Sequence, residues 1–515
     1  MSDKETKSPD GVLDSASQIT TPGADSNEAP KIFNWWSMLA TCVSLMATWE
    51  AICSTMTAGL ISGGPVSLVY GFISAAIGTI ATALSLSECA SMCPTTGGQY
   101  HYVALLSPQK LSTPFSYAAG WITVFGWQAV AGSAPFLAGT MIQGLLVLND
   151  PGYVYERWHG TLLYWAVLAV ALVINTMAIK LLPAIEVTMM ILHVGLYVVL
   201  LIAMLVLAPT KGSASFVFTT FTNSSGWESD GVAWCIGMLS AAYVMIGYDG
   251  AAHLSTTMHN PSTSVPRAMI GSVLINAMIG LTFLIAILFC IQDLDTALST
   301  PTGFPIIEIF FQITQNRAGA TALTSTVILM AFGATIPLVT SAAWTLQAFA
   351  ADSGIPFSNL IARKRAKDDV PIIAMILTVS CLALLGLLNI ASTTAFNAVL
   401  SLATVGLYIS YLLPTFLMLY RRIYDNESLP YGPFRLGAAG IPVNIISVIY
   451  TTVTSVFLLF PPYQPVTAAN FNYSSVILGA VLVFCAVYWI LGGKKAYHGL
   501  KVEILGVNVG NWNDA

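Results

Sequence analysis

"ATWEAICSTM" (residues 47–56) and "AAYVMIGYDGAAHLSTT" (residues 241–257) each place a carboxylate in the middle of a long apolar run. These carboxylates belong to Glu50 and Asp249. A charge inside a membrane span costs about 2.5–3.5 kcal/mol on insertion scales, so each one needs a partner or a cavity. Two glycines flank Asp249, and glycine weakens a helix. The second run is therefore predicted to be an interrupted helix, which membrane depth tolerates only where it lines a cavity.

The composition around these two runs is that of a membrane protein. Of the 515 residues, 56% are hydrophobic and 8% are charged, against about 25% charged in a soluble domain. A membrane span needs about 20 apolar residues. Twelve such stretches are predicted, centred near residues 48, 76, 130, 169, 196, 243, 279, 334, 381, 407, 450 and 483. The fold class is therefore an all-α polytopic membrane protein with twelve transmembrane helices.

Charge placement predicts the orientation of these spans. With the N-terminus assigned to the cytoplasm, sixteen Lys and Arg residues fall on that side and three on the other. This asymmetry follows the positive-inside rule and places both termini in the cytoplasm. Residues 1–34 are polar and predicted to be a disordered tail, and residues 494–515 form the second tail. Asn223 and Asn472 begin glycosylation sequons in loops assigned to the outside.

The cysteines, histidines and charged residues argue against a metal or cofactor site, an enzyme and a nucleic-acid-binding protein. The eight cysteines lie in or next to apolar spans, so they are interpreted as small buried hydrophobes, without a metal site or cofactor. Six scattered histidines without a zinc-protease motif argue against an enzyme. The net charge of −5 without a basic stripe indicates no nucleic-acid partner. A short amphipathic helix is expected at residues 302–313. Glu88 and Glu186 lie near the cytoplasmic ends of their spans, so they are interpreted as residues of the membrane–water interface.

Six stretches of the chain resemble a known family. Three are "GLISGGPVSLVYG" (59–71), "MCPTTGGQYHYVALLSP" (92–108) and "IGYDGAAHLSTTMHNPSTSVPRAMIGSV" (246–273). They are similar to the fungal amino-acid/choline transporter family of the amino acid–polyamine–organocation superfamily. "FVFTTFTNSSGW", "IQDLDTALSTPTGFPI" and "ASTTAF" look like choline permeases, and γ-aminobutyrate permeases are further relatives. The likeness runs over nearly the whole chain beyond the N-terminal tail.

The resemblance implies a LeuT-like fold, a five-plus-five inverted repeat with two further C-terminal helices. The first repeat would be residues 35–210, the second residues 211–422, and the last two spans residues 423–493. It also implies proton-driven uptake across the plasma membrane. Residues 47–54 and 246–251 match the unwound stretches of spans one and six in the family.

The candidate site residues cluster at those stretches. Carboxylates and aromatic faces suit a cationic amine, and free amides at a broken helix suit a substrate carboxylate. The candidate substrate-binding residues are Thr48, Trp49, Glu50, Ala51, Trp127, Ile246, Gly247, Tyr248, Asp249 and Gly250. Glu50 and Asp249 are candidate proton carriers, while Thr340 and Ser341 are the hydroxyl ligands expected if sodium is the coupling ion.

These observations predict a secondary active transporter that imports a small nitrogenous solute by alternating access, coupled to protons. An amino acid or related amine is the expected substrate, with γ-aminobutyrate among them. One alternative is a choline or quaternary-amine transporter, because such a cation needs aromatic faces and one carboxylate. A second alternative, of another class, is a nutrient sensor that binds the same solute without moving it.

Overall fold

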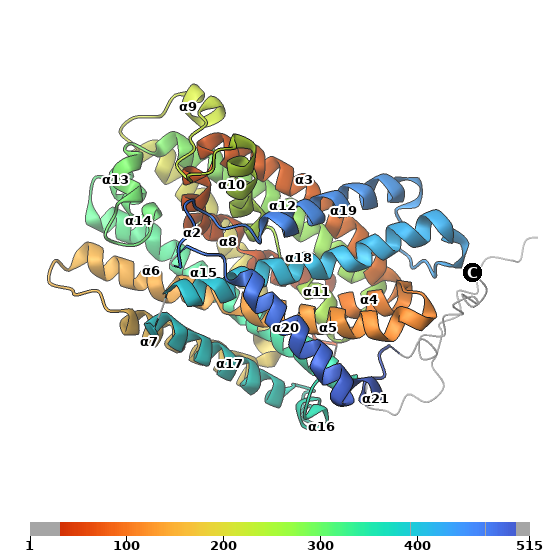
Figure 1. Ribbon diagram of the computed structural model, residues 1–515. Coiled ribbons are helices and arrows are strands. Elements are labelled where there is room, and N and C mark those ends of the chain that lie inside the picture. Colours follow the sequence, from red (N-terminus) through yellow and green to blue (C-terminus); the bar gives the residue numbers. More distant parts are fainter. Residues whose placement is uncertain (1–30, 392, 469, 501–515) are drawn as a thin grey trace, which may run out of the picture.

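The computed structural model describes residues 31–391, 393–468 and 470–500, and the described chain is almost entirely helical (Figure 1). The predictions for residues 1–30 and 501–515 lie outside the described residues. The last residues of the predicted N-terminal tail are packed against the bundle. The buried Phe33 donates its amide hydrogen to the carbonyl oxygen of Thr257 at 3.1 Å, and Asn34 caps the first helix.

Helices long enough to cross a membrane dominate the described chain. In chain order the spans are α1 with α2 (Trp35–Met46, Thr48–Ile61), α3 (Gly64–Met92), α5 with α6 (Gln109–Ala131, Ser133–Asn149), α7 (Arg157–Met177), α8 (Leu182–Leu207), α10 with α11 (Asp230–Val244, Gly250–His253), α12 (Pro261–Cys290), α15 (Arg317–Ala351), α17 (Ile372–Ala391), α18 (Thr393–Tyr424), α19 (Gly440–Phe457) and α20 (Ser474–Tyr488).

The predicted number of spans is confirmed. Within the described residues, eleven helices are long and apolar enough to cross a membrane. The twelfth span is the sixth in chain order, and it falls below the length of a continuous span because it is divided into α10 and α11. The shorter helices are α4 (Gln99–Leu106), α9 (Ala214–Thr219), α13 (Leu294–Leu298), α14 (Pro305–Thr314), α16 (Ser358–Ile361) and α21 (Lys494–Ala496).

The bundle has two ends, which we name by the residues they carry. The terminal side holds α4, α16 and α21, and the sequon side holds α9 and α13 (Figure 1). Asn223 lies in the loop after α9, and Gln464, in the loop that carries Asn472, donates its amide hydrogen to the Ser225 carbonyl of the same loop at 2.7 Å. Helix α14, which matches the predicted amphipathic segment, packs against α15 near the sequon side.

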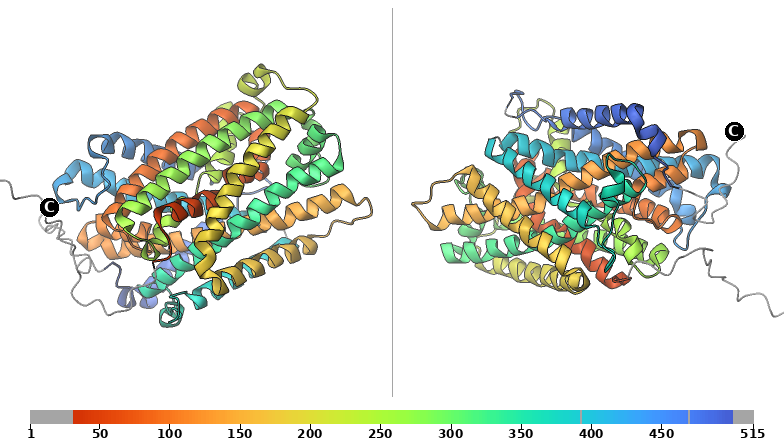
Figure 2. Two further views of the ribbon diagram at one scale, coloured as in Figure 1. Left: turned by 180° about the vertical axis from the view of Figure 1, so that it is seen from behind. Right: turned by 90° about the horizontal axis from the view of Figure 1, so that it is seen from below.

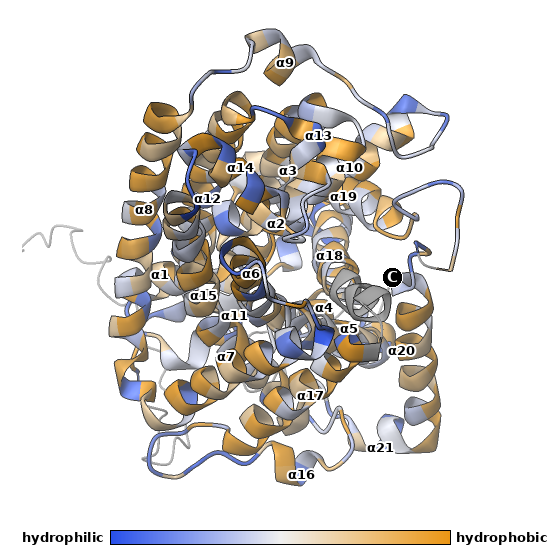
Figure 3. Ribbon diagram, turned by 90° about the vertical axis from the view of Figure 1, so that its left-hand side faces the viewer, coloured by the Kyte–Doolittle hydropathy of each residue, from blue (hydrophilic) through white to orange (hydrophobic). Residues whose placement is uncertain are grey.

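Hydrophobic side chains cover the outside of the bundle, where lipid would lie. The hydropathy colouring shows apolar outer faces on α8, α17 and α20 (Figure 3). Helix α8 presents large exposed residues such as Ile191, Val198 and Ile202, while α1 and α12 pack against its inner side (Figure 2). Exposed apolar surface on this scale is stable in hydrocarbon, and it leaves the interior free for polar groups.

Candidate substrate and coupling-ion site

The first span is broken at a single residue. Ala47 adopts φ 42° and ψ 48°, in the left-handed region, and the helix resumes at Thr48. The implied unwound stretch 47–54 is therefore wrong beyond its first residue, because Thr48 onward closes ordinary helical bonds. Asn276 of α12 stabilises the break, since its side chain accepts from the Thr48 amide at 3.4 Å and donates to the Val43 carbonyl at 3.4 Å.

The break in the sixth span is wider and falls where the glycine pattern predicted it. Helix α10 ends at Val244 and α11 begins at Gly250. Gly247 takes φ 99°, a conformation that other residues rarely adopt. A Cβ atom added there would lie 2.5 Å from the side chain of Leu45. Glycine is thus required at this position by both its backbone conformation and the close approach of span one.

The two breaks are joined directly. Thr48 donates its hydroxyl hydrogen to the Val244 carbonyl at 2.9 Å, which satisfies an oxygen freed where α10 ends. The Cys42 thiol contacts the Tyr248 carbonyl oxygen at 3.7 Å. Spans one and six therefore hold each other's open backbone groups at the centre of the bundle.

Asp249 is the centre of a buried hydrogen-bond network. Its carboxylate accepts from Gln99 Nε2 at 2.5 Å, Trp127 Nε1 at 3.0 Å and the Tyr411 hydroxyl at 2.5 Å. His253 Nε2 lies 3.3 Å away. These partners come from α4, α5, α11 and α18, so the charge is compensated by fixed donors from four elements.

Glu50 is also buried, and it has a different kind of partner. Its Oε1 lies 2.7 Å from Nδ1 of His193, a residue of α8 that is itself buried. Glu50 Oε2 and His193 Nε2 have no hydrogen-bond partner among the described residues. A carboxylate and an imidazole in direct contact can share a proton.

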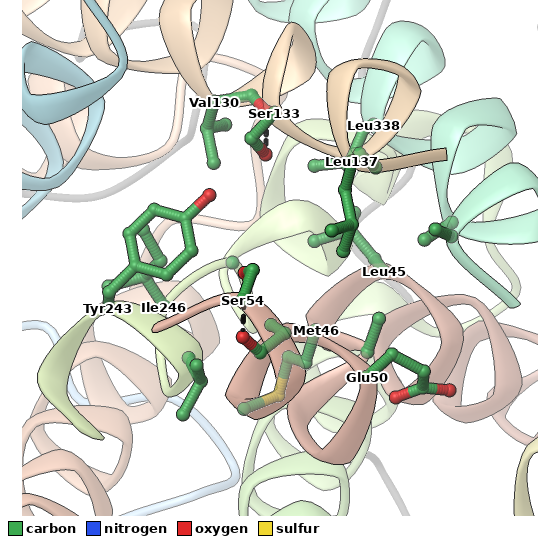
Figure 4. A pocket seen from close by; sticks show the side chains of 17 residues that line it. Leu45, Met46, Glu50, Ser54, Val130, Ser133, Leu137, Tyr243, Ile246 and Leu338 are labelled. Carbon is green, nitrogen blue, oxygen red and sulfur yellow. Dashed lines mark hydrogen bonds between the residues drawn. The ribbon is translucent and has the colours of Figure 1, made fainter. Parts of the chain in front are cut away.

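A cavity of about 60 Å³ lies where the two breaks meet (Figure 4). The residues that line it come from spans one, three, six and eight; they are Leu45, Met46, Ala47, Glu50, Ala51, Ser54, Val130, Ser133, Ala134, Leu137, Tyr243, Val244, Ile246, Gly247, Ala331, Ala334 and Leu338. Figure 4 shows Glu50 at the edge of the cavity, with its carboxylate directed away from Tyr243 and Ser54.

Only some of the predicted substrate-binding residues border this cavity. Glu50, Ala51, Ile246 and Gly247 do, while the others lie beside it. The Trp49 ring packs toward His193 and Phe283, with ring centroids 5.9 and 5.7 Å apart.

Two other predicted aromatic residues also point away from the cavity. Trp127 directs its indole N–H to Asp249, and Tyr248 packs on Tyr411 with ring centroids 5.3 Å apart. Gly250 faces the Leu45 and Ser341 side chains, which would lie 2.9 and 3.2 Å from an added Cβ atom.

The two hydroxyls proposed for sodium differ in their surroundings. Thr340 donates to Asn175 Oδ1 at 2.5 Å and lies 2.9 Å from the Ile336 carbonyl. The Ser341 hydroxyl is buried and has no partner among the described residues. Over the same residues, no group of three or more His, Cys, Asp or Glu side chains is placed to hold a metal ion.

The terminal side of the site is closed by a second set of polar contacts. Asp352, at the end of α15, accepts from the Tyr100 hydroxyl at 2.8 Å and lies 2.7 Å from His101 Nε2. His101 Nδ1 contacts the Thr95 hydroxyl at 2.7 Å. Together with the Asp249 network, these contacts separate the cavity from the terminal end of the bundle.

Sequence reasoning missed several residues of the site. Gln99 and Tyr411 carried no signal, because neither lies near Asp249 in the chain. His193 had a usable signal, namely a lone histidine within an apolar span. The interfacial interpretation of Glu88 and Glu186 was wrong, since both are fully buried within the bundle. Both residues lie near the ends of their spans, but neighbouring helices pack over them and bury their side chains.

A multi-pass helical bundle with two interrupted helices around a central polar site is the architecture of a membrane transporter. The comparisons with known proteins define its family. The chain belongs to the amino acid permease family, whose family model matches residues 33–483. This result confirms the family predicted from the sequence motifs.

Individual relatives cover most of the chain. It is 33% identical to the choline transporter of Saccharomyces cerevisiae, over 92% of this chain and 83% of that protein. It is 29% identical to amino-acid permease 2 of Neurospora crassa, over 91% of this chain and 86% of that one. A manganese transporter structure from Eremococcus coleocola shares the fold, with a TM-score of 0.53 at 12% identity, covering 89% of this chain and 94% of that chain.

Proposed function

We propose that this permease imports an amino acid or a related amine across the plasma membrane by proton-coupled alternating access. The observation that carries the proposal is that the breaks of spans one and six border one cavity, with Glu50 at its edge. Open backbone groups at such breaks, together with a carboxylate, provide the donors, acceptors and charge that a small polar solute requires.

The side from which solute enters in this conformation is inferred from the contacts that close the other side. Ser54, Leu137 and Tyr243 line the cavity from the helix halves that run toward the sequon side, and Leu45, Met46 and Val130 line it from the terminal halves. The Asp249 and Asp352 contacts close the terminal side. If the terminal side is cytoplasmic, as the Lys and Arg distribution indicates, this conformation would receive solute from outside the cell.

The same orientation makes Asn223 and Asn472 available to the glycosylation machinery. Each side-chain amide donates two hydrogen bonds in the folded chain, and a glycan would displace one of them. Loss of a glycosidase-sensitive mass shift when both residues are changed to Gln would support an outside location. An unmodified wild-type protein would remove this support.

The lining favours a primary or secondary amine as substrate. Tyr243 is the aromatic residue among the lining residues, whereas a quaternary ammonium group is usually enclosed by several aromatic faces. An amine that carries N–H groups can instead donate to Glu50 and to open carbonyls. Choline remains the second candidate, because a relative that is 33% identical is named a choline transporter.

We propose that charged groups buried near the cavity link solute binding to protonation, with Glu50 and His193 the pair closest to it. Protonation of this pair changes its charge at the position where substrate would sit, so substrate and proton binding would be linked. Asp249 is a weaker candidate, because four side chains from separate elements already surround its carboxylate.

The test is uptake of labelled solutes into vesicles that contain the purified protein. Imposed pH and sodium gradients are varied separately, and choline, γ-aminobutyrate and the common amino acids compete for uptake. Accumulation of an amine or amino acid driven by the pH gradient supports the proposal. Choline as the best competitor would select the second candidate, and a sodium requirement would replace the proton. Binding without accumulation would indicate a nutrient sensor.

A further inference from the structure

Glu186 is a buried carboxyl group that the site described above does not use. It lies in the second turn of α8, near the terminal side, and its side chain is fully buried. Neither of its oxygens has a hydrogen-bond partner among the described residues. Glu50, Glu88 and Asp249, the other buried carboxylates of the spans, each have a basic or hydrogen-bonding partner.

The groups packed around Glu186 offer it no compensating charge. Helices α1, α12, α14 and α15 contact α8. Cys42 of α1 lies within electrostatic reach of Glu186. The remaining titratable groups on these helices lie at the far end of the bundle or are exposed to solvent; they are Arg267, Cys290, Glu308 and Arg317. Lys180, which precedes α8, is also exposed.

An ionised carboxylate in these surroundings would be strongly destabilising. Burial of an unpaired charge costs several kcal/mol or more, and a buried group avoids this cost by becoming neutral. Glu186 is therefore a protonated carboxylic acid in the conformation that is closed on the terminal side. His193 lies seven residues further along the buried face of α8, about 10 Å along the helix axis, so the two are separate proton-binding positions.

The neighbouring part of span one provides a way to change the exposure of Glu186. Helix α1 packs against α8, and α1 is joined to α2 only through the left-handed residue Ala47. A rigid shift of α1 about Ala47 would admit water from the terminal side to Glu186. Its O–H bond would then break, with the proton passing to that water and the carboxylate becoming solvated.

We propose that Glu186 carries the coupling proton of the transport cycle, held while the terminal side is closed and released there when α1 moves away. This assignment rests on the proposed function: Glu50 and His193 link solute binding to protonation, and Glu186 binds the proton that is carried across. It also explains why a carboxyl group that has no partner in the described part of the chain is placed among apolar helices, where leucine or methionine would pack at lower cost.

The experiment compares wild-type protein with Glu186→Gln in vesicles under a pH difference of one unit. Each pH unit is worth about 1.4 kcal/mol per proton, so one coupled proton drives about a tenfold solute accumulation. Glutamine copies the shape of the neutral acid but cannot release a proton. We measure accumulation, solute exchange at equal pH and proton entry reported by a trapped pH dye. Glu228→Gln, which alters an exposed carboxylate, is the matched control.

The expected result is that Glu186→Gln lowers the ratio of accumulation to exchange about tenfold and abolishes solute-dependent proton entry. Glu186→Asp should restore part of that proton entry, which a purely structural side chain would not do. If Glu186→Gln accumulates solute under the pH gradient as strongly as the wild type, the assignment is wrong and the proposed function still stands. Wild-type protein that shows no proton entry would overturn both.

Discussion

At the scale of single residues, Asp249 shows how the bundle accommodates a charge. Removing its carboxylate in Asp249→Ala should leave the Gln99, Trp127 and Tyr411 donors buried without an acceptor. Each buried donor left unpaired costs about 1–3 kcal/mol, so the free energy of unfolding should fall by several kcal/mol. The melting temperature of the detergent-solubilised protein measures this loss, and transport should be lost with it.

Tyr411→Phe is the matched comparison, because it removes one donor of the Asp249 carboxylate, together with the long 3.4 Å contact that the hydroxyl accepts from the Gly247 amide. It should cost about 1 kcal/mol, clearly less than Asp249→Ala. Equal melting temperatures for Asp249→Ala and wild type would contradict a network centred on this carboxylate.

Glu50 is expected to act in transport more than in stability. Glu50→Gln keeps a side chain of the same size at the cavity edge and can still bond His193, so the protein should fold and reach the membrane. Gradient-driven uptake should drop by about tenfold or more, because the charge that responds to the proton is gone. Uptake measured across pH 5–8 checks this, with exposed Glu156→Gln as control; an unchanged pH profile would exclude Glu50 from coupling.

At the scale of elements, the interruption of span one depends on the backbone of Ala47. A left-handed conformation costs an L-amino acid about 1–2 kcal/mol, and a β-branched side chain raises that cost. Ala47→Val should therefore lower the melting temperature and favour a continuous helix, whereas Ala47→Gly should raise the melting temperature slightly.

Valine at position 47 also fills space in the cavity, so Ala51→Val is the control for bulk. Ala51 lines the same cavity from within regular helix. If the two valine variants melt alike, the left-handed residue is not what limits the stability of this break.

At the scale of the whole molecule, a buried ion pair connects helices from distant parts of the chain. Arg422 of α18 bonds the Glu88 carboxylate of α3 and donates to Asn444 of α19 at 2.7 Å. Glu88 also accepts from the backbone amide of Leu436 at 2.9 Å. Helix α19 is thus joined to α3 and α18 by a buried charged contact on the terminal side, in addition to hydrogen bonds from Asn444 to Ser85 and from Ser447 to Thr82.

Arg422→Met should cost about 3–5 kcal/mol in unfolding free energy, because it leaves Glu88 charged and buried without its cation. The double variant with Glu88→Gln should regain part of that loss in thermal melting. Arg435→Met serves as the control, because Arg435 is exposed and stacks on Tyr431 at 3.8 Å, a contact worth about 0.5–1 kcal/mol. Equal destabilisation by both single variants would refute a structural role specific to the buried pair.

Much of the fold was predictable from local sequence. The spans follow from apolar runs that must be long enough to cross a bilayer, and the break of span six follows from glycines beside Asp249. The break of span one was located less well, because Ala47 is not a residue type that marks a left-handed turn. Its conformation is maintained by Asn276, which lies more than 200 residues away in the chain.

The sequence by itself determined that Glu50 and Asp249 had to be sheltered within the bundle, because lipid cannot solvate a charge. Only the tertiary structure decided the means: Asp249 has four side-chain partners, Glu50 has His193, and Glu186 has no hydrogen-bond partner among the described residues. These hydrogen-bond partners come from residues far apart in the chain. The hydropathy of each segment does not predict which helices pack against one another. The same packing turned Trp49 and Trp127 away from the cavity and buried Glu186 where a proton can be held.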